Sequence, residues 1–293
     1  MKFRIGKPLG FSDLGDREIQ EDTMYPSIYD LREDNRFFIV CDGMGGHEKG
    51  EVASNTIVKE LSKGYNQFVD NGYTVETFEE ILESARQSLD QYYNEEYGAH
   101  QMGTTLTFLS FTEEGYFAAH IGDSRIYHIR PAEVTEFVYR SKDHTLVSDL
   151  LDSGVLTPIK ALTFSEKNII NKALLPKTRQ EVDIFEGTDV QAGDYFMLCS
   201  DGVTEFLTDE MIRFIFAPYR TADEIIELIH THCKQLSSDN NTCIVIPIHS
   251  INEDTLKETT QTSSLIAESL VVDDLLQDSI NYFQSNVMTN DER

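Results

Sequence analysis

The apolar positions of the first 250 residues fall into short runs and longer periodic segments. Runs with the length and composition of β-strands cover residues 37–41, 104–111, 115–121, 125–130, 181–186, 194–199 and 243–248. Helical spacing of three or four residues joins Ile57, Leu61, Tyr65 and Phe68 in the segment at about 50–70, and recurs at about 221–236. Residues 76–97 look like a third long helix.

The connections between the runs at 104–111, 115–121 and 125–130 are too short for a crossover helix. We therefore expect these three strands to form an antiparallel meander. Helices grouped between blocks of antiparallel strands indicate an α+β domain in which helices pack on sheets.

After Ile248 the chain changes character, because residues 251–293 are rich in Ser, Thr, Asn, Asp and Glu. This acidic tail contains a stripe of apolar residues three or four apart, which predicts an amphipathic helix: Val272, Leu276, Ile280, Phe283 and Val287. Docking of this helix on its own domain is favoured over docking on a partner, since terminal segments are ordered only when they are tied down.

Charge narrows the range of partners. The chain of 293 residues carries 51 acidic and 24 basic residues, a formal charge of −27, so its field repels nucleic acid and anionic membrane surfaces. No stretch approaches the roughly 20 apolar residues that cross a bilayer, so we expect no membrane partner and a soluble, cytoplasmic protein. The four cysteines have no paired spacing and are expected to be reduced core residues.

Carboxylates stand directly beside several of the apolar runs. "FIVCDG" and "MLCSDG" each lead a run into an aspartate followed by glycine, and "HIGDSR", "SSDNNTCIVI" and "REIQEDT" bring further acids to sheet edges. The carboxylates concerned are Glu21, Asp22, Asp42, Asp123, Asp201 and Asp239. Such a cluster is unfavourable unless cations neutralise it, and oxygen ligands favour Mg²⁺ or Mn²⁺. Two ions about 3.5–4 Å apart could activate water for attack on phosphorus.

Each feature alone has a simpler interpretation. A single Asp-Gly is most often a turn, and "GDSR" could be a hairpin loop with a local salt bridge. The glycine-rich loop is not a Walker loop, because Glu51 follows Gly50, and not a dinucleotide fingerprint, because Glu48 replaces the third glycine. His47 and His144 are candidate general acids, although a lone histidine is more often structural.

Eight ordered blocks together resemble the PPM-type, or type-2C, metal-dependent protein serine/threonine phosphatases in their bacterial form. The blocks, between Phe11 and Ile248, are "GDREIQEDTMY", "CDGMGGHEKGEVAS", "MGTTLTFL", "AHIGDSRIYHIR", "SKDHTLVSDLLDSGVLT", "NIINKALLP", "GDYFMLCSDGVTEFLTDE" and "SDNNTCIVI". The resemblance implies a four-layer α/β/β/α sandwich with two central antiparallel sheets. Residues 1–250 would be the catalytic domain, with a flap at about 141–180, and 251–293 the tail.

The resemblance also implies a site for two Mn²⁺ or Mg²⁺ ions. Asp42 would bridge the ions, and Gly43 would bind through its carbonyl oxygen. Asp201 and Asp239 would complete the shell of the second metal, with Glu21 acting through a bound water.

Three further residues have implied roles around this pair of ions. Asp123 would help to hold a third, weaker ion, and Asp22 would lie just outside the ligands. Arg17 would bind the substrate phosphate through its planar fork. Catalysis would then depend on Asp42, Asp201, Asp239 and Arg17, with direct attack of a metal-bridging hydroxide on a phosphoserine or phosphothreonine monoester.

The chain departs from the family at three positions. Gln20 replaces the usual Asn, which is not a ligand, and Lys172 replaces a common Arg, which keeps the charge but loses bidentate contacts. Met44 stands where eukaryotic members have a proposed general-acid His. Bacterial members share this Met, so the general acid stays open, a metal-bound water being one candidate.

The flap is locally basic within an acidic chain. Its positive charges could steer anionic phosphopeptides towards the metals or could form a solvated loop. The residues are Lys142, Lys160, Lys167, Lys172, Lys177 and Arg179.

The function predicted best is a phosphatase that acts on phosphorylated proteins and opposes a bacterial serine/threonine kinase. A catalytically silent phosphoprotein-binding relative is the second hypothesis, weakened because every carboxylate position is filled. A scaffold role of the tail and a small-molecule phosphatase also stay open.

Overall fold

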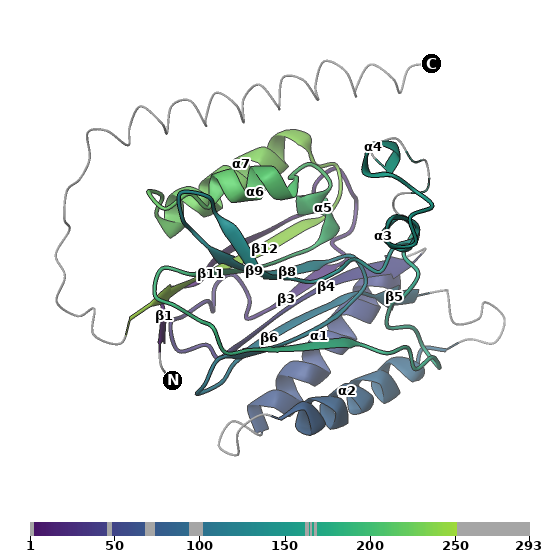
Figure 1. The fold of residues 1–293 in the computed structure, drawn as a ribbon. Coiled ribbons are helices and arrows are strands. Elements are labelled where there is room, and N and C mark those ends of the chain that lie inside the picture. Colours follow the sequence, from purple (N-terminus) through teal and green to yellow (C-terminus); the bar gives the residue numbers. More distant parts are fainter. Residues whose placement is uncertain are drawn as a thin grey trace.

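The computed structural model describes residues 3–45, 49–67, 74–93, 102–161, 164, 166 and 169–250. Two six-stranded antiparallel sheets form the centre (Figure 1). The first has the order β1 (Arg4–Ile5), β12 (Asn241–His249), β11 (Tyr195–Cys199), β8 (Arg125–Arg130), β9 (Glu136–Arg140), and β2 (Leu9–Asp13) also pairs with β12. The second has the order β10 (Asp183–Gly187), β7 (Tyr116–Ile121), β6 (Leu106–Phe111), β4 (Phe37–Gly45), β3 (Asp22–Tyr25), and β5 (Met102–Thr104) pairs with β4.

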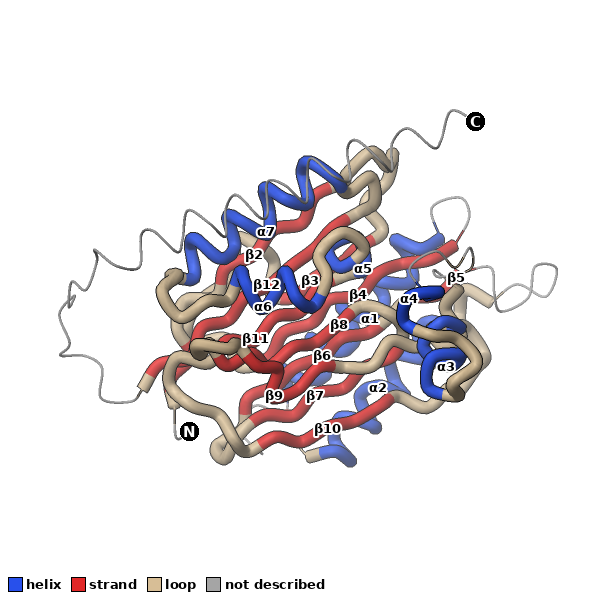
Figure 2. Tube along the Cα trace, turned by 45° about the horizontal axis from the view of Figure 1, so that its top comes forward, coloured by secondary structure: helices blue, strands red, loops and turns tan. Residues whose placement is uncertain are grey.

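Helices cover the outer faces of both sheets. The helices α1 (Lys49–Gln67) and α2 (Val75–Asp90) lie on the second sheet, and α5 (Asp201–Thr204), α6 (Asp209–Ile215) and α7 (Ala222–Leu236) lie on the first. In Figure 2, α6 and α7 cross in front of the strands, whereas α1 and α2 lie behind them. Two short helices, α3 (Leu146–Asp152) and α4 (Pro158–Ala161), lie at one end of the sandwich. The predicted four-layer α/β/β/α sandwich is confirmed.

Three apolar clusters hold the four layers together. One packs α1 and α2 against the second sheet, one packs α5 to α7 against the first, and the third fills the space between the sheets. The four cysteines are free and buried, as predicted. Burial of these clusters supplies the main stabilisation of the sandwich.

The helix α7 shows how the sequence sets these elements locally. Thr221 forms a capping box with Glu224: its side chain accepts from the Glu224 amide, and the Glu224 carboxylate accepts from the Thr221 amide. The apolar stripe of α7 is buried, including Ile225, Ile229 and Leu236. The spacing that predicted this helix therefore matches its core-facing side.

The predicted meander of residues 104–130 is wrong. The strands β6 and β7 pair, but β8 belongs to the other sheet, where it lies between β11 and β9. The connection at Gly122, with φ of +105°, leads the chain across the interface between the sheets. A short connection excludes a crossover helix, but it can still span the roughly 10 Å between two stacked sheets.

Other boundaries differ less. The helix α2 ends at Asp90, not at 97, and the short strands β1, β2, β3 and β9 and the helices α3 to α6 were not predicted. The tail at 251–293, with its predicted amphipathic helix, lies outside the described residues. No helix in the described part of the chain is both long enough and apolar enough to cross a membrane.

Candidate metal centre

Asp42 lies inside β4 rather than at its end, which corrects the prediction of a carboxylate at a strand terminus. Asp22 of β3 is its direct cross-strand neighbour. Two threonines fix the Asp42 backbone: its amide donates to the Thr105 hydroxyl at 2.9 Å, and its carbonyl accepts from the Thr104 hydroxyl at 2.8 Å. Sequence reasoning missed both threonines, although "MGTTLTFL" was among the matching blocks.

Asp201 approaches from the other sheet as the first residue of α5, directly after Ser200. The Ser200 hydroxyl donates to Asp22 Oδ2 at 2.7 Å, and the Ser200 amide donates to the Thr242 carbonyl at 3.0 Å. Ser200 therefore connects the acids of the two sheets, and sequence reasoning missed it as well.

A third group of residues surrounds Asp239, just before β12. Arg17 Nη2 lies 2.7 Å from Asp239 Oδ2 in a partly exposed ion pair. The neighbouring Asn240 accepts from the Glu21 amide at 2.8 Å and donates to the Leu14 carbonyl at 2.8 Å. Asn240 therefore ties the segment with Arg17 and Glu21 to the segment with Asp239.

Three glycines leave room for these segments to meet. A Cβ at Gly43 would lie 2.1 Å from the Gly50 carbonyl oxygen, and one at Gly50 would lie 2.3 Å from Glu21 Oε1. A Cβ at Gly202 would lie 2.1 Å from the Asn240 carbonyl oxygen. The glycines after both aspartates therefore allow the close approach of another backbone segment.

The carboxylates perturb one another's protonation. Burial, followed by the charge of Asp201, raises the pKa of Asp42 well above its usual range. Burial raises the pKa of Asp22 to about 7, and burial together with the charge of Asp201 raises the pKa of Asp123 to about 8. The pKa values of Asp201 and Glu21 are raised too, mainly by burial. Without cations, the cluster therefore holds protons that isolated carboxylates would release.

Unpartnered oxygens point to what the cluster lacks. Asp22 Oδ1 and Asp123 Oδ1 are buried without a hydrogen-bond partner among the described residues. Buried polar atoms are rarely left unpaired, and a divalent cation would remove the repulsion among the carboxylates and could contact the unpaired oxygen of Asp123. The acidic cluster, made of Glu21, Asp22, Asp42, Asp123, Asp201 and Asp239, therefore fits hard divalent cations.

Comparison with known proteins decides the family. The sequence profile described as Protein phosphatase 2C matches residues 14–237. This chain belongs to the protein phosphatase 2C family. The chain is similar to protein phosphatase PhpP of Streptococcus pneumoniae, with 32% identity over 246 residues, which cover 83% of this chain and 96% of that protein. The chain is a protein serine/threonine phosphatase.

Solved structures agree with this assignment. The serine/threonine phosphatase PstP/Ppp of Mycobacterium tuberculosis superposes with a TM-score of 0.71 and 27% identity, covering 84% of this phosphatase and 99% of that chain. A PstP catalytic domain in complex with two manganese ions superposes with a TM-score of 0.67 and 26% identity, covering 85% and 100%. The α+β sandwich is therefore that of the family.

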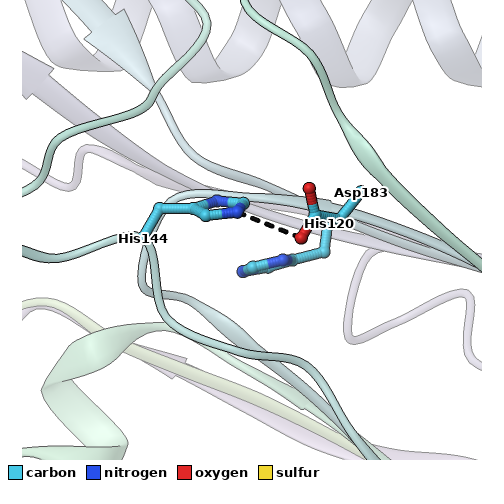
Figure 3. A group of neighbouring side chains, drawn as sticks. All are labelled: His120, His144 and Asp183. Carbon is cyan, nitrogen blue, oxygen red and sulfur yellow. Dashed lines mark hydrogen bonds and ion pairs between the residues drawn. The ribbon is translucent and has the colours of Figure 1, made fainter. Parts of the chain in front are cut away.

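A second group of possible ligands shares no residue with the acidic cluster of the phosphatase. His120, His144 and Asp183 each offer an atom within 4.8 Å of the others (Figure 3). His144 Nδ1 accepts from the Gly122 amide at 3.1 Å, so the proton of this ring sits on Nε2, which donates to Asp183 Oδ2 at 3.2 Å. Burial lowers the pKa of His144, which favours this neutral form. Because the only proton of His144 is on Nε2, this nitrogen cannot bind a metal while the ring stays neutral. The group is therefore a hydrogen-bonded cluster.

The same contacts bear on two earlier hypotheses. The single proton of His144 is donated from Nε2 to Asp183, so this ring has no other proton to give to a leaving group as a general acid. His47, the other candidate, lies outside the described residues. Arg125 of "GDSR" pairs across the fold rather than within a local hairpin. It binds Asp143 through two bonds of 2.7 and 2.6 Å across 18 residues.

Most described basic residues of the flap are already paired. Lys142 contacts Asp152, Lys172 lies 3.9 Å from Asp183, and Arg179 Nη2 lies 2.7 Å from Asp90. Lys177 also lies 3.9 Å from Asp90, and Lys167 lies outside the described residues. These acids offset much of the positive charge that steering of phosphopeptides would require.

Proposed function

We propose that this phosphatase hydrolyses phosphoserine and phosphothreonine in proteins at a centre of two Mn²⁺ or Mg²⁺ ions, with a weaker third ion. The observation that carries the proposal is the convergence of buried carboxylates from both sheets, which raise one another's pKa values and include an unpartnered oxygen of Asp123. The PstP structure with two manganese ions supports the same stoichiometry. The phosphatase would oppose a serine/threonine kinase in the cytoplasm.

The ligands follow from the arrangement of the acidic cluster. Asp42 would bridge the two ions, because its carboxylate interacts with those of Asp201, Asp22 and Asp123. The Gly43 carbonyl, Asp201 and Asp239 would complete the shells, and Glu21 would act through water. When bound, the ions supply a water activated for direct attack on phosphorus, without a phosphoenzyme.

Two other acids would serve at the margin of the centre. Asp123, whose carboxylate interacts with that of Asp201, would hold the third ion. Asp22 would stay outside the ligands, since Ser200 already donates to one of its oxygens. The protonation state of Asp22 would then change the negative charge around the ions.

Arg17 would bind the substrate phosphate. Its guanidinium side chain is 56% exposed and pairs with Asp239 in this structure, so its fork stands at the surface of the cluster. Release of Asp239 to an ion would free the fork for two phosphate oxygens. Arg17 would thereby hold the monoester in line with the site of attack.

The test is hydrolysis of a phosphothreonine peptide and of p-nitrophenyl phosphate, with Mn²⁺ or with EDTA. Asp201→Asn removes one ligand charge with little change in shape, and Asp34→Asn at an exposed loop is the matched control. We expect turnover of both substrates that requires Mn²⁺, survives Asp34→Asn and is largely lost in Asp201→Asn. A folded wild type without turnover at any Mn²⁺ concentration would favour the silent phosphoprotein-binding alternative.

The division of the chain is part of the proposal. Residues 1–250 would form the catalytic domain, and residues 251–293 an acidic tail whose helix docks on the domain or on a partner. Truncation after residue 250 should leave peptide turnover intact. Loss of turnover, with the fold retained, would show that the tail contributes to catalysis.

A further inference from the structure

Two histidines hold the peptide groups around Gly122 from both sides. The Gly122 amide donates to His144 Nδ1 at 3.1 Å, and the Gly122 carbonyl accepts from the His144 amide at 2.8 Å and from His120 Nε2 at 3.0 Å. The two imidazole rings stack with centroids 4.7 Å apart (Figure 3). Both hydrogen-bonding groups of one residue are thereby satisfied by this pair.

Gly122 has little freedom to move away from this position. Its φ is +105°, and a Cβ there would lie 2.5 Å from the side chain of Thr105. Thr105 also accepts from the Asp42 amide at 2.9 Å, so the packing behind Gly122 reaches the strand of the proposed bridging ligand. The backbone at Gly122 is therefore placed by contacts on three sides.

This placement matters because Asp123 is the next residue. Its Oδ1 is buried without a hydrogen-bond partner in the described part of the chain, so its own side-chain contacts do not fix that oxygen. On the far side, Arg125 is held by the bidentate contact with Asp143. The loop that carries Asp123 is thus anchored at both ends by consecutive residues of the flap, Asp143 and His144.

His144 also closes the base of the flap. Its carbonyl accepts from the Asn171 amide at 3.0 Å, and the next residues continue the contact, because the Leu146 amide donates to the Ile169 carbonyl at 2.9 Å. The two ends of the flap therefore meet at the residue whose side chain holds Gly122. A shift of the flap cannot leave that contact unchanged.

The two rings present different nitrogens to Gly122. His144 uses Nδ1 as an acceptor, and His120 uses Nε2 as a donor. Burial lowers the pKa of His120 to about 4, which keeps that ring neutral. Its single proton sits on Nε2, because the Gly122 carbonyl can only accept. Each ring is therefore suited to its contact in one tautomer only.

We propose that His144 and His120 are positioning residues that hold Asp123 in place through Gly122, and that His144 links the base of the flap to the position of the third ion. The second part rests on the proposed function, since it assigns an ion to Asp123. The first part stands on the hydrogen bonds alone.

Reciprocal amide substitutions test the proposal. Asn places its carbonyl oxygen near the position of a histidine Nδ1, and Gln places its amide nitrogen near that of Nε2. His144→Asn should keep the acceptor for the Gly122 amide, and His144→Gln should lose it. At the other ring the order reverses, because His120→Gln keeps the donor and His120→Asn loses it. Each pair supplies its own matched control.

The first readout is hydrogen exchange of the Gly122 amide in metal-free protein. We expect at least tenfold faster exchange in His144→Gln than in His144→Asn, with the melting temperatures of the two variants alike. Equal exchange in both variants would overturn the clamp. This readout needs neither metal nor substrate, so it holds even if the proposed function fails.

The second readout is Mn²⁺ binding, followed as the weakest phase of a calorimetric titration. Outer partners of metal ligands typically change affinity 10–100-fold, so His144→Gln and His120→Asn should weaken that phase about tenfold, and their counterparts less than threefold. The kcat for p-nitrophenyl phosphate should fall in the same order with KM nearly constant. Unchanged weak-phase affinity in all four variants would refute the link to the ion.

Discussion

Two Asp-Gly pairs look alike in the sequence and differ in the fold. Asp42-Gly43 lies inside β4, which continues to Gly45, whereas Asp201 opens α5 directly after β11. A similar context, an apolar run that ends near a Cys and is followed by Asp-Gly, therefore accompanies a strand interior in one sheet and a strand-to-helix turn in the other.

The glycines explain what the two pairs share. Gly43 makes room for Gly50 and for the Glu21 backbone, and Gly202 makes room for the Asn240 backbone beside Asp239. In both places the missing Cβ of the glycine after an aspartate lets a second acid-bearing segment approach closely. In this fold both glycines therefore accompany the close approach of another segment, whereas only Asp201-Gly202 lies at a turn.

The largest expected effect distinguishes Asp42, the proposed bridging ligand, from Asp201, a ligand of one ion. If Asp42 bridges both ions, Asp42→Asn should remove both from a Mn²⁺ titration and lower kcat on the order of 10³-fold, since metal ions contribute several kcal/mol. Asp201→Asn should remove one ion and lower kcat on the order of 10²-fold, a loss about ten times smaller than that in Asp42→Asn.

Exposed Asp34→Asn serves as the control for both changes and should match wild type. Equal ion stoichiometry in Asp42→Asn and Asp201→Asn would contradict the bridging role. Melting temperatures measured in EDTA should not fall in either variant, because each replacement removes a buried, repelled carboxyl.

The glycines should give the next effect. Gly43→Ala and Gly202→Ala each force a methyl group within 2.1 Å of a backbone carbonyl oxygen, which we expect to cost about 1–3 kcal/mol of unfolding free energy and to weaken Mn²⁺ binding. Urea unfolding measures the cost. Gly154→Asn is the control, since Gly154 has open space around it and a φ of +71° that Asn tolerates, so that variant should lose less than about 1 kcal/mol.

The sequence was informative where local spacing and composition determine the structure. The three long helices and the strand-end position of Asp201 follow from apolar periodicity and run length, whereas Asp42 lies inside its strand. The transfer of β8 to the other sheet, and the hydrogen bonds of Ser200 and Asn240, depend on residues far apart in the chain. No single-sequence pattern encodes which strand lies beside which, so these features came only from the tertiary structure.

The pH dependence of the melting temperature should differ between the metal-free protein and the protein with bound ions. A carboxyl whose folded pKa is raised stabilises the fold below its unfolded pKa, near 4, and loses that contribution as pH rises through the folded value. Burial raises the pKa of Asp22 to about 7 and that of Asp123 to about 8, so metal-free protein should melt about 5 °C lower at pH 8.5 than at pH 6.

Saturating Mn²⁺ should reverse the sign of this slope, because ions compete with the protons that the cluster holds at low pH. Differential scanning calorimetry in EDTA and in Mn²⁺ measures both slopes. Asp22→Asn is a useful control, since removal of this carboxyl should make the metal-free slope shallower while Asp123 keeps the larger share of it. A metal-free melting temperature that rises from pH 6 to 8.5 would contradict the raised pKa values.

The smallest effect tests whether Arg17 acts through its charge or through the planar shape of its guanidinium group. Arg17→Lys keeps a cation beside Asp239 but loses the fork, so KM for both the phosphopeptide and p-nitrophenyl phosphate should rise about five- to tenfold while kcat changes less than twofold. The matched control is Arg32→Lys, an exposed arginine that lies 3.7 Å from Asp30 and should leave KM unchanged. If Arg17 only shields Asp239, KM will stay constant and the affinity for Mn²⁺ will change instead. The two outcomes therefore distinguish an arginine that binds substrate from one that merely neutralises a metal ligand.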